Sequence, residues 1–237
     1  MKVSELKYSW VILALAWLSF MASWIPRTTY PPLIPEMASA LQLTYTQAGL
    51  LMTGFWVGYI VTQLPSGYIS DRTGVRRTLA SALALIGIFS IMTGTASSFA
   101  DCLAYRTLCG LAAGCIFAPA AASVLRWFST ERRGTAITLY VTGARIGATA
   151  GLILSPIIST FFNAWRWSFW LLSTPAFSTA IAVLLFMKES PETRFSHKTG
   201  KRQEATKTPL SYGLIFKKKS LWLLFLAEVG FFCLLTQ

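Results

Sequence analysis

The chain alternates between long runs without a charged residue and short segments rich in arginine and lysine. Such runs cover residues 8–26, 37–70, 78–100, 107–125 and 167–187, and the run 134–165 is interrupted only by Arg145. A helix needs about 20 mostly apolar residues to cross a hydrocarbon core of roughly 30 Å. The runs show no period of two, so they predict helices rather than barrel strands. We therefore expect an all-α polytopic membrane protein.

A seventh apolar run begins near Ser220 and reaches the chain end at Gln237. We expect a six-helix transmembrane bundle at residues 1–187, a basic cytoplasmic linker at 188–219 and the start of a truncated seventh helix at 220–237.

Lys2 and Lys7 ahead of the first run leave a signal peptide as an alternative interpretation. Its apolar stretch is longer than the central part of a usual signal peptide, and the residues around Ala22 make a poor cleavage site, so a retained helix is favoured.

The composition supports a membrane protein and orients it. Of the 237 residues, 54% are hydrophobic and 13% are charged, against about 25% charged in soluble domains. Seventeen of the 21 lysines and arginines fall on alternate loops, with only Arg166 on the opposite side. Positive residues stay on the cytoplasmic side, so we expect a cytoplasmic N-terminus in a plasma membrane. The net charge of +12 then faces anionic lipid heads rather than nucleic acid.

The side chains needed for catalysis or metal binding are scarce. The four cysteines have no C-x-x-C spacing and are expected to be packed free thiols: Cys102, Cys109, Cys115 and Cys233. His197 stands alone, and no grouping for acid-base or nucleophilic catalysis is present. We therefore expect a protein that is not an enzyme and has neither a metal site nor a cofactor.

The segment 67–77 between the second and third runs carries a dense motif. A tight turn suits Gly74. Gly67 lies one helical turn before Asp71, and such a small residue would let another helix approach closely. Asp71 could then pair with a basic group on that neighbouring helix. The pattern G-x-x-x-D-R-x-G-x-R-R resembles the signature of the major facilitator superfamily. The resemblance implies a cytoplasmic gate latch that holds two six-helix halves together in the outward-facing state. Its residues here are Gly67, Asp71, Arg72, Gly74, Arg76 and Arg77.

Two other stretches agree with this family. Residues 106–110 resemble its R-x-x-x-G motif, and residues 126–136 resemble a junction in the anion:cation symporters and organic-anion transporters. Members usually have twelve helices in two related halves. The resemblance therefore implies an N-terminal half with the start of a second half, and a monomer when full length.

Charged residues inside apolar runs are costly and need a reason. Arg27 shares a helix face with Trp24 and Tyr30, and the Pro31-Pro32 pair is expected to bend or end this helix. Arg27 either reaches outward to lipid headgroups or binds an anion in a central cavity. Related organic-anion transporters place an arginine in this region to bind substrate, which implies that role for Arg27, with Tyr30 beside it.

Three more charges fall inside the apolar runs. Arg145 lies about 17 Å along its helix from Gly134, near mid-membrane, and is either a cavity-facing ligand or a partner in a charge pair. The resemblance associates Arg106 with proton coupling or a charge network; the alternative is that its side chain extends outward to the lipid headgroups. Glu228 could titrate with the coupling ion or pair with Arg27.

Two further features of the runs bear on function. Tyr59 and Gln63, one turn apart, could bind a solute, although packing is the simpler role. Glycines at spacing four in the run 134–165 predict close helix packing, whereas Ser155-Pro156 leaves the helix-5 motif of drug antiporters incomplete.

Taken together, the sequence predicts a secondary active transporter working by alternating access. Three arginines against one acid inside the runs favour a small anionic solute, imported by proton or sodium symport. The alternatives are a proton-coupled efflux antiporter for amphipathic compounds, and a membrane enzyme or scaffold.

Overall fold

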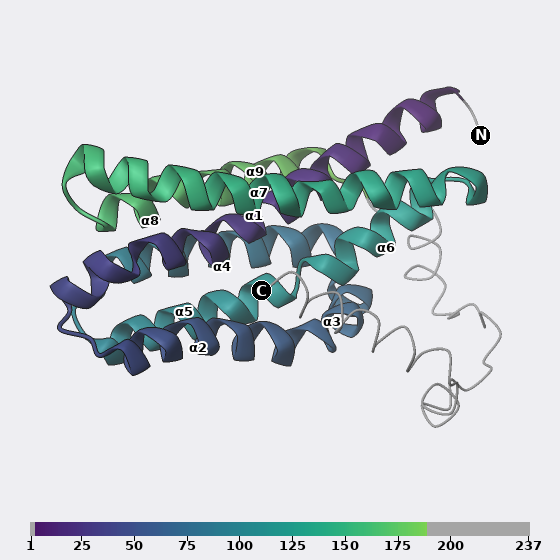
Figure 1. Ribbon diagram of the computed structural model, residues 1–237. Coiled ribbons are helices and arrows are strands. Elements are labelled where there is room, and N and C mark those ends of the chain that lie inside the picture. The colour runs from purple at the N-terminus through teal and green to yellow at the C-terminus, as the bar shows by residue number, and fades with distance from the viewer. Residues whose placement is uncertain (1–2, 189–237) are drawn as a thin grey trace, which may run out of the picture. The chain divides into compact units, whose positions relative to one another are not determined.

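The computed structural model describes residues 3–188, with side chains from Tyr8 onward. This part of the chain is helical (Figure 1). Its elements are α1 (Val3–Ala40), α2 (Tyr45–Gln63), α3 (Ser66–Thr73), α4 (Val75–Thr95), α5 (Phe99–Gly114), α6 (Phe117–Trp127), the 3-10 helix η1 (Thr130–Arg132), α7 (Arg133–Phe162), α8 (Arg166–Leu172) and α9 (Thr174–Phe186). The predicted linker, the predicted seventh helix, Glu228, Cys233 and His197 lie outside the described residues.

Five helical segments of the described region are long and apolar enough to cross a membrane. They are Tyr8–Ala40, Val75–Thr95, Phe99–Trp127, Thr130–Phe162 and Arg166–Phe186. The remaining predicted span corresponds to the 19-residue α2, whose two glutamines lower its mean hydropathy. The prediction of an all-helical, multi-span membrane protein is confirmed, although α2, which is long enough to cross a membrane, has a lower mean hydropathy than the other five segments.

Two of the predicted runs form pairs of helices rather than single ones. α5 ends at Gly114, and α6 begins at Phe117 after the non-helical Cys115. Pro119 lies in the first turn of α6, where its missing N–H leaves no helical bond unmade. α8 and α9 are separated at Ser173 in the same way, with Pro175 at the start of α9.

The first helix was predicted to bend or end at Pro31-Pro32, and it does not end there. α1 continues to Ala40 and contains four prolines. Thr28 and Thr29 each donate a hydroxyl hydrogen to a carbonyl one turn earlier, that of Trp24 at 3.1 Å and that of Ile25 at 2.8 Å. Prolines are tolerated in membrane helices, where neighbouring helices and side chains support the backbone around them.

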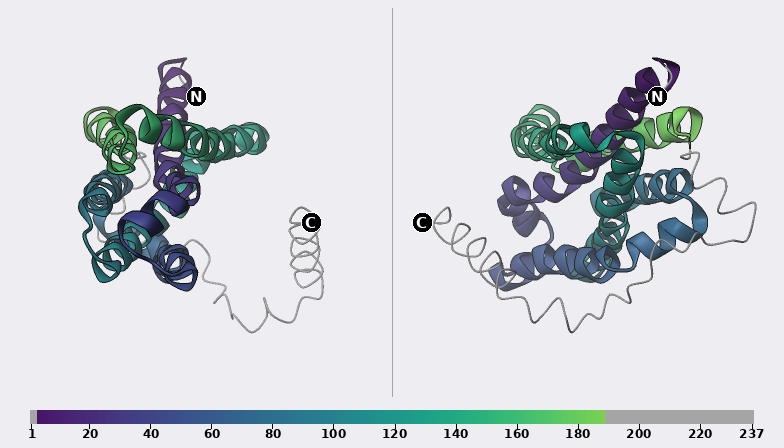
Figure 2. Two further views of the ribbon diagram at one scale, coloured as in Figure 1. Left: turned by 60° about the vertical axis from the view of Figure 1, so that its left-hand side comes forward. Right: turned by 90° about the vertical axis from the view of Figure 1, so that its right-hand side faces the viewer.

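The predicted close packing of the glycine-rich helix is confirmed. α7 lies along α1 (Figures 1 and 2). A Cβ atom added at Gly143, Gly147 or Gly151 would lie 2.7, 2.2 or 2.7 Å from a backbone oxygen of α1. Only glycine allows the two backbones to approach this closely.

A second glycine contact joins α2 to α5. A Cβ at Gly58 would lie 2.3 Å from the carbonyl oxygen of Thr107, and one at Gly110 would lie 2.0 Å from that of Phe55. α4 packs on α5 as well. These contacts set the position of α2 against the rest of the bundle, and with it the residues that α2 places opposite Arg27.

Candidate functional site

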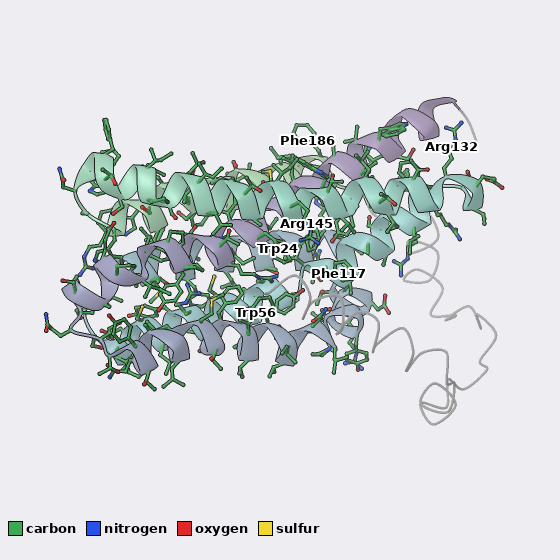
Figure 3. All side chains as sticks on the ribbon, in the orientation of Figure 1. Trp24, Trp56, Phe117, Arg132, Arg145 and Phe186 are labelled. Carbon is green, nitrogen blue, oxygen red and sulfur yellow. The ribbon has the colours of Figure 1, made fainter. Side chains whose placement is uncertain are left out.

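Arg27 lies inside the bundle, surrounded by aromatic rings. Its side chain is 3% exposed. The guanidinium carbon lies 4.0 Å from the ring centroid of Trp24 on α1, and 4.6 and 4.4 Å from those of Trp56 and Tyr59 on α2. Phe55 follows at 5.4 Å. We call these four rings around Arg27 the aromatic cage; Figure 3 marks Trp24 and Trp56 on their two helices.

The aromatic cage leaves polar hydrogens without an acceptor. The Nε of Arg27 and the Nε1 of Trp24 are both buried and make no hydrogen bond. Among the described residues, no acid forms an ion pair with Arg27. Rings attract a cation but do not accept its in-plane N–H groups as a carboxylate does. A buried charge of this kind is costly unless an anion compensates it.

The alternative interpretation, in which the side chains of Arg27 and Arg106 extend to the lipid headgroups, does not fit their burial. Arg106 is 2% exposed. Its Nε donates to the carbonyl of Leu51 at 3.0 Å, and its guanidinium carbon lies 4.0 Å from the ring centroid of Tyr30. Both arginines are therefore held within the bundle.

Tyr30 does not join Arg27 in the aromatic cage. Its side chain is fully buried, and its hydroxyl donates to the carbonyl of Ala48 at 2.8 Å. Its ring packs against Arg106 instead. Positions three residues apart on a helix diverge by about 60° around its axis, so Tyr30 turns towards α5 whereas Arg27 turns towards Tyr59.

The other predicted solute ligands differ in exposure. Tyr59 is partly buried and belongs to the aromatic cage. Gln63 is partly buried one turn further along α2. Arg145 is exposed on α7, and in the view of Figure 3 it lies near Trp24 along the length of the bundle. Its charge is thus presented at the surface of the described bundle rather than packed within it.

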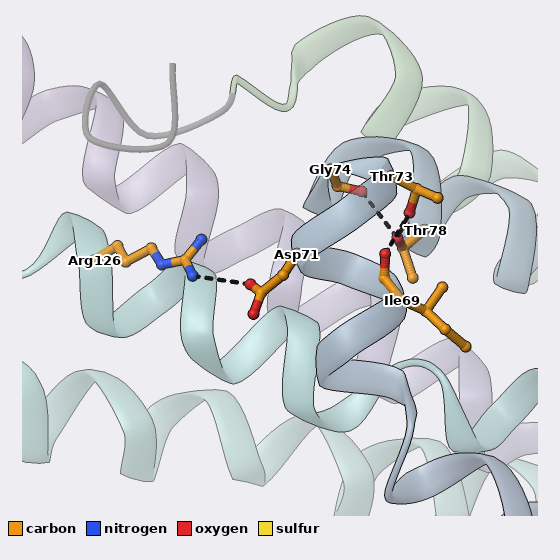
Figure 4. Close-up of polar contacts among 6 residues, drawn as sticks. All are labelled: Ile69, Asp71, Thr73, Gly74, Thr78 and Arg126. Atoms are coloured by element: carbon orange, nitrogen blue, oxygen red, sulfur yellow. Dashed lines mark hydrogen bonds and ion pairs between the residues drawn. The ribbon is translucent and has the colours of Figure 1, made fainter. Parts of the chain in front are cut away.

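The predicted turn at the signature motif is present. Gly74 adopts φ 88°, a conformation that favours glycine. Its carbonyl accepts from the amide and the hydroxyl of Thr78, and that hydroxyl lies 2.7 Å from the hydroxyl of Thr73 (Figure 4). These bonds fix the angle between α3 and α4.

Asp71 has a basic partner on a neighbouring helix, as the sequence predicted. Its carboxylate lies 3.4 Å from the Nη2 of Arg126 on α6 (Figure 4). The expected close approach of a helix at Gly67 is not seen, since a Cβ there would meet nothing within 4 Å among the described residues. This face of α3 points away from the described helices. Arg76 donates to the carbonyl of Leu184, and Arg72 stacks on Tyr68 at 4.5 Å.

Two members of the aromatic cage were not predicted from the sequence. Phe55 and Trp56 lie on α2, and nothing local in the sequence says which α2 residues face Arg27. A usable signal was the spacing of Trp56 and Tyr59, which puts two aromatic residues on one side of a charge-free helix. The cysteines agree with expectation where described: Cys102, Cys109 and Cys115 are free thiols.

Comparisons with known proteins agree with this arrangement. The sequence profile of the Major Facilitator Superfamily matches residues 13–237. The hexuronate transporter of Bacillus subtilis is 28% identical over 208 residues, which cover 86% of this chain and 49% of that protein. The probable sulfoacetate transporter of Cupriavidus necator is 23% identical over 231 residues, with 92% and 53% covered. The chain thus spans about half the length of these relatives.

Solved structures show the same fold. An inward-open structure of the xylose transporter of E. coli superposes with a TM-score of 0.71 at 16% identity, covering 80% of this chain and 50% of that one. At this identity the likeness bears on the helical arrangement alone.

Proposed function

Because this chain belongs to the Major Facilitator Superfamily, we propose that it forms the N-terminal part of a secondary transporter for a small organic anion. The observation that carries the proposal is Arg27, a buried guanidinium with an unbonded Nε and no acid partner among the described residues. A solute carboxylate would supply an acceptor for the Nε of Arg27, and binding would offset the cost of burying its charge.

The aromatic cage supports a preference for an anion with a flat binding group. Trp24, Trp56 and Tyr59 surround the guanidinium and exclude water from it. Electrostatic attraction is stronger where water is excluded. A carboxylate accepts two parallel N–H bonds from arginine. Hexuronate and sulfoacetate, named for two relatives, both carry a carboxylate.

Transport requires the protein to move the bound solute across the membrane. The solute binds between two halves of the transporter, which rock to open it to each side in turn. Arg145, exposed on α7, faces the solute or the second half, and Gln63 adds a hydrogen bond near the aromatic cage. Proton or sodium symport into the cell drives uptake. Arg106 belongs to the charge network, in which Glu228 takes part.

Asp71 and Arg126 form the cytoplasmic latch within this proposal. Gly67 has open space above it, which suits a helix of the second half packing there when the transporter faces outward. The N-terminus and this motif lie on the cytoplasmic side of the plasma membrane, in keeping with the distribution of lysine and arginine.

Uptake by the full-length protein tests the proposal. Cells expressing it receive radiolabelled hexuronate, dicarboxylate, sulfonate and neutral sugar. We expect uptake of at least one anion and not of the neutral sugar, and a loss of more than tenfold in Arg27→Lys, since lysine lacks the two-pronged donor geometry. Arg132→Lys, at an exposed site on η1, is the matched control. Uptake of neutral solutes alone, unchanged by Arg27→Lys, would refute the proposal.

A further inference from the structure

A groove of about 680 Å³ lies on the bundle between α3, α4 and α5. Such a volume falls within the range of roughly 300–1,000 Å³ typical of small-molecule sites. It shares no residue with the aromatic cage, and Arg27 does not line it. The groove is thus separate from the proposed solute site.

The groove is apolar along most of its length. Its wall on α4 is a single stripe that runs from Arg77 to Phe89, about 18 Å at the rise of an α-helix. Leu85 and Phe89 on α4 and Leu108 and Leu111 on α5 are among the residues that line it. Leu85 and Leu108 are 42% and 37% exposed, so apolar surface is open to whatever occupies the groove.

One end of the groove is polar and positive. Arg72 and Arg77 line it there, together with hydroxyl groups of Thr73, Thr78 and Ser81. No acidic side chain is among the residues that line the groove. Arg77 also lies in the first turn of α4, where the helix dipole adds positive potential.

We propose that this groove binds an anionic phospholipid, with an acyl chain along Leu85 and Leu108 and the phosphate between Arg72 and Arg77. The groove and such a lipid are complementary: the groove is long and apolar with two cations at one end, and a phospholipid is long and apolar with a phosphate at one end. The polar end lies at the Gly74 turn, so the lipid belongs to the leaflet that this turn faces. Anionic lipids are concentrated in the cytoplasmic leaflet.

Native mass spectrometry of the purified chain tests the proposal. Phosphatidylglycerol and phosphatidylcholine with identical acyl chains are added in equal amounts. We expect wild type to retain phosphatidylglycerol about tenfold more strongly, and Arg72→Gln/Arg77→Gln to bring the preference below twofold. Arg132→Gln/Arg133→Gln removes two charges outside the groove and should leave the preference within twofold of wild type.

Cys115 provides a second readout, because it lines the groove and is partly exposed. Bound phosphatidylglycerol should slow its alkylation by N-ethylmaleimide at least threefold in wild type and not in Arg72→Gln/Arg77→Gln. Circular dichroism is used to check that both double variants fold. Equal retention of the two lipids, an equal loss in both double variants, or a dimer with no bound lipid would each overturn the proposal.

Discussion

Arg27 and Arg106 lie against the same ring, that of Phe55, with their guanidinium carbons 5.4 and 5.5 Å from its centroid. The two carbons are therefore no more than about 11 Å apart, the sum of those distances. At that separation two unit charges repel by about 1.5 kcal/mol at an effective dielectric constant of 20. An anion at Arg27 would be attracted by both charges. The guanidinium of Arg106 itself contacts Leu51 and Tyr30, so it would act on the anion from a distance.

The charge of Arg106 should therefore strengthen anion binding without touching the anion. We expect Arg106→Gln to weaken binding about tenfold, the equivalent of about 1.4 kcal/mol. Arg106→Lys keeps the charge but loses the bond to Leu51, so it should bind nearly as wild type while unfolding at a lower temperature. Binding is measured by isothermal titration with the anion that the uptake experiment identifies, and stability is measured by thermal unfolding. Equal loss of binding in both variants would argue against an electrostatic role.

Tyr30 should matter for stability rather than for the solute. Tyr30→Phe removes the hydroxyl that donates to Ala48 and leaves the ring against Arg106. The free energy of unfolding should fall by about 1 kcal/mol, because one buried hydrogen bond is lost. Anion uptake should stay within twofold of wild type once expression is matched. A fall in uptake as large as that of Arg27→Lys would place Tyr30 at the solute instead.

The contact between α1 and α7 should tolerate no side chain. At Gly147 a Cβ would lie 2.2 Å from the carbonyl oxygen of Met21, so Gly147→Ala forces two backbones apart. We expect a loss of more than 2 kcal/mol, in the range of overpacked sites. Gly49→Ala is the control, because nothing lies within 4 Å of its Cβ and alanine is the better helix residue by about 0.5–1 kcal/mol. Denaturant unfolding of both variants should show changes of opposite sign.

The ion pair of Asp71 and Arg126 should contribute little to the stability of the bundle itself. The two side chains are 68% and 33% exposed, and their charged atoms are 3.4 Å apart. Exposed pairs of this kind are worth about 0.2–1 kcal/mol. A double-mutant cycle with Asp71→Asn and Arg126→Gln should give a coupling energy below 1 kcal/mol that falls with added salt. A coupling above 2 kcal/mol would show that the pair is a structural contact and not an exchangeable latch.

Features set by local sequence were predictable, whereas contacts between helices were not. The glycine spacing of α7 and the turn at Gly74 follow from backbone geometry, and both were predicted. The continuation of α1 through Pro31 depends on the packing of α1 against neighbouring helices, which the positions of the prolines do not reveal. Which α2 residues face Arg27 depends on the register between two helices, and that register is set by the fit of Gly110 against Phe55.

Trp24 gives the most selective test of the aromatic cage, because its Nε1 is buried without a hydrogen-bond partner one turn from Arg27. Trp24→Phe keeps an aromatic ring beside the guanidinium and removes the indole N–H together with part of the ring surface. A hydrogen bond to a charged group is worth about 1.5–3 kcal/mol, so anion binding should weaken roughly 10- to 100-fold. Trp170→Phe is the matched control, since its Nε1 is also buried and unbonded, beside Gly94 on another pair of helices.

Isothermal titration of both tryptophan variants separates the two explanations for an unbonded indole. If Trp24→Phe alone weakens binding, the indole of Trp24 serves the anion. If both variants bind as wild type and both gain stability, the two indoles are simply imperfectly packed, and Arg27 must hold its anion without help from Trp24.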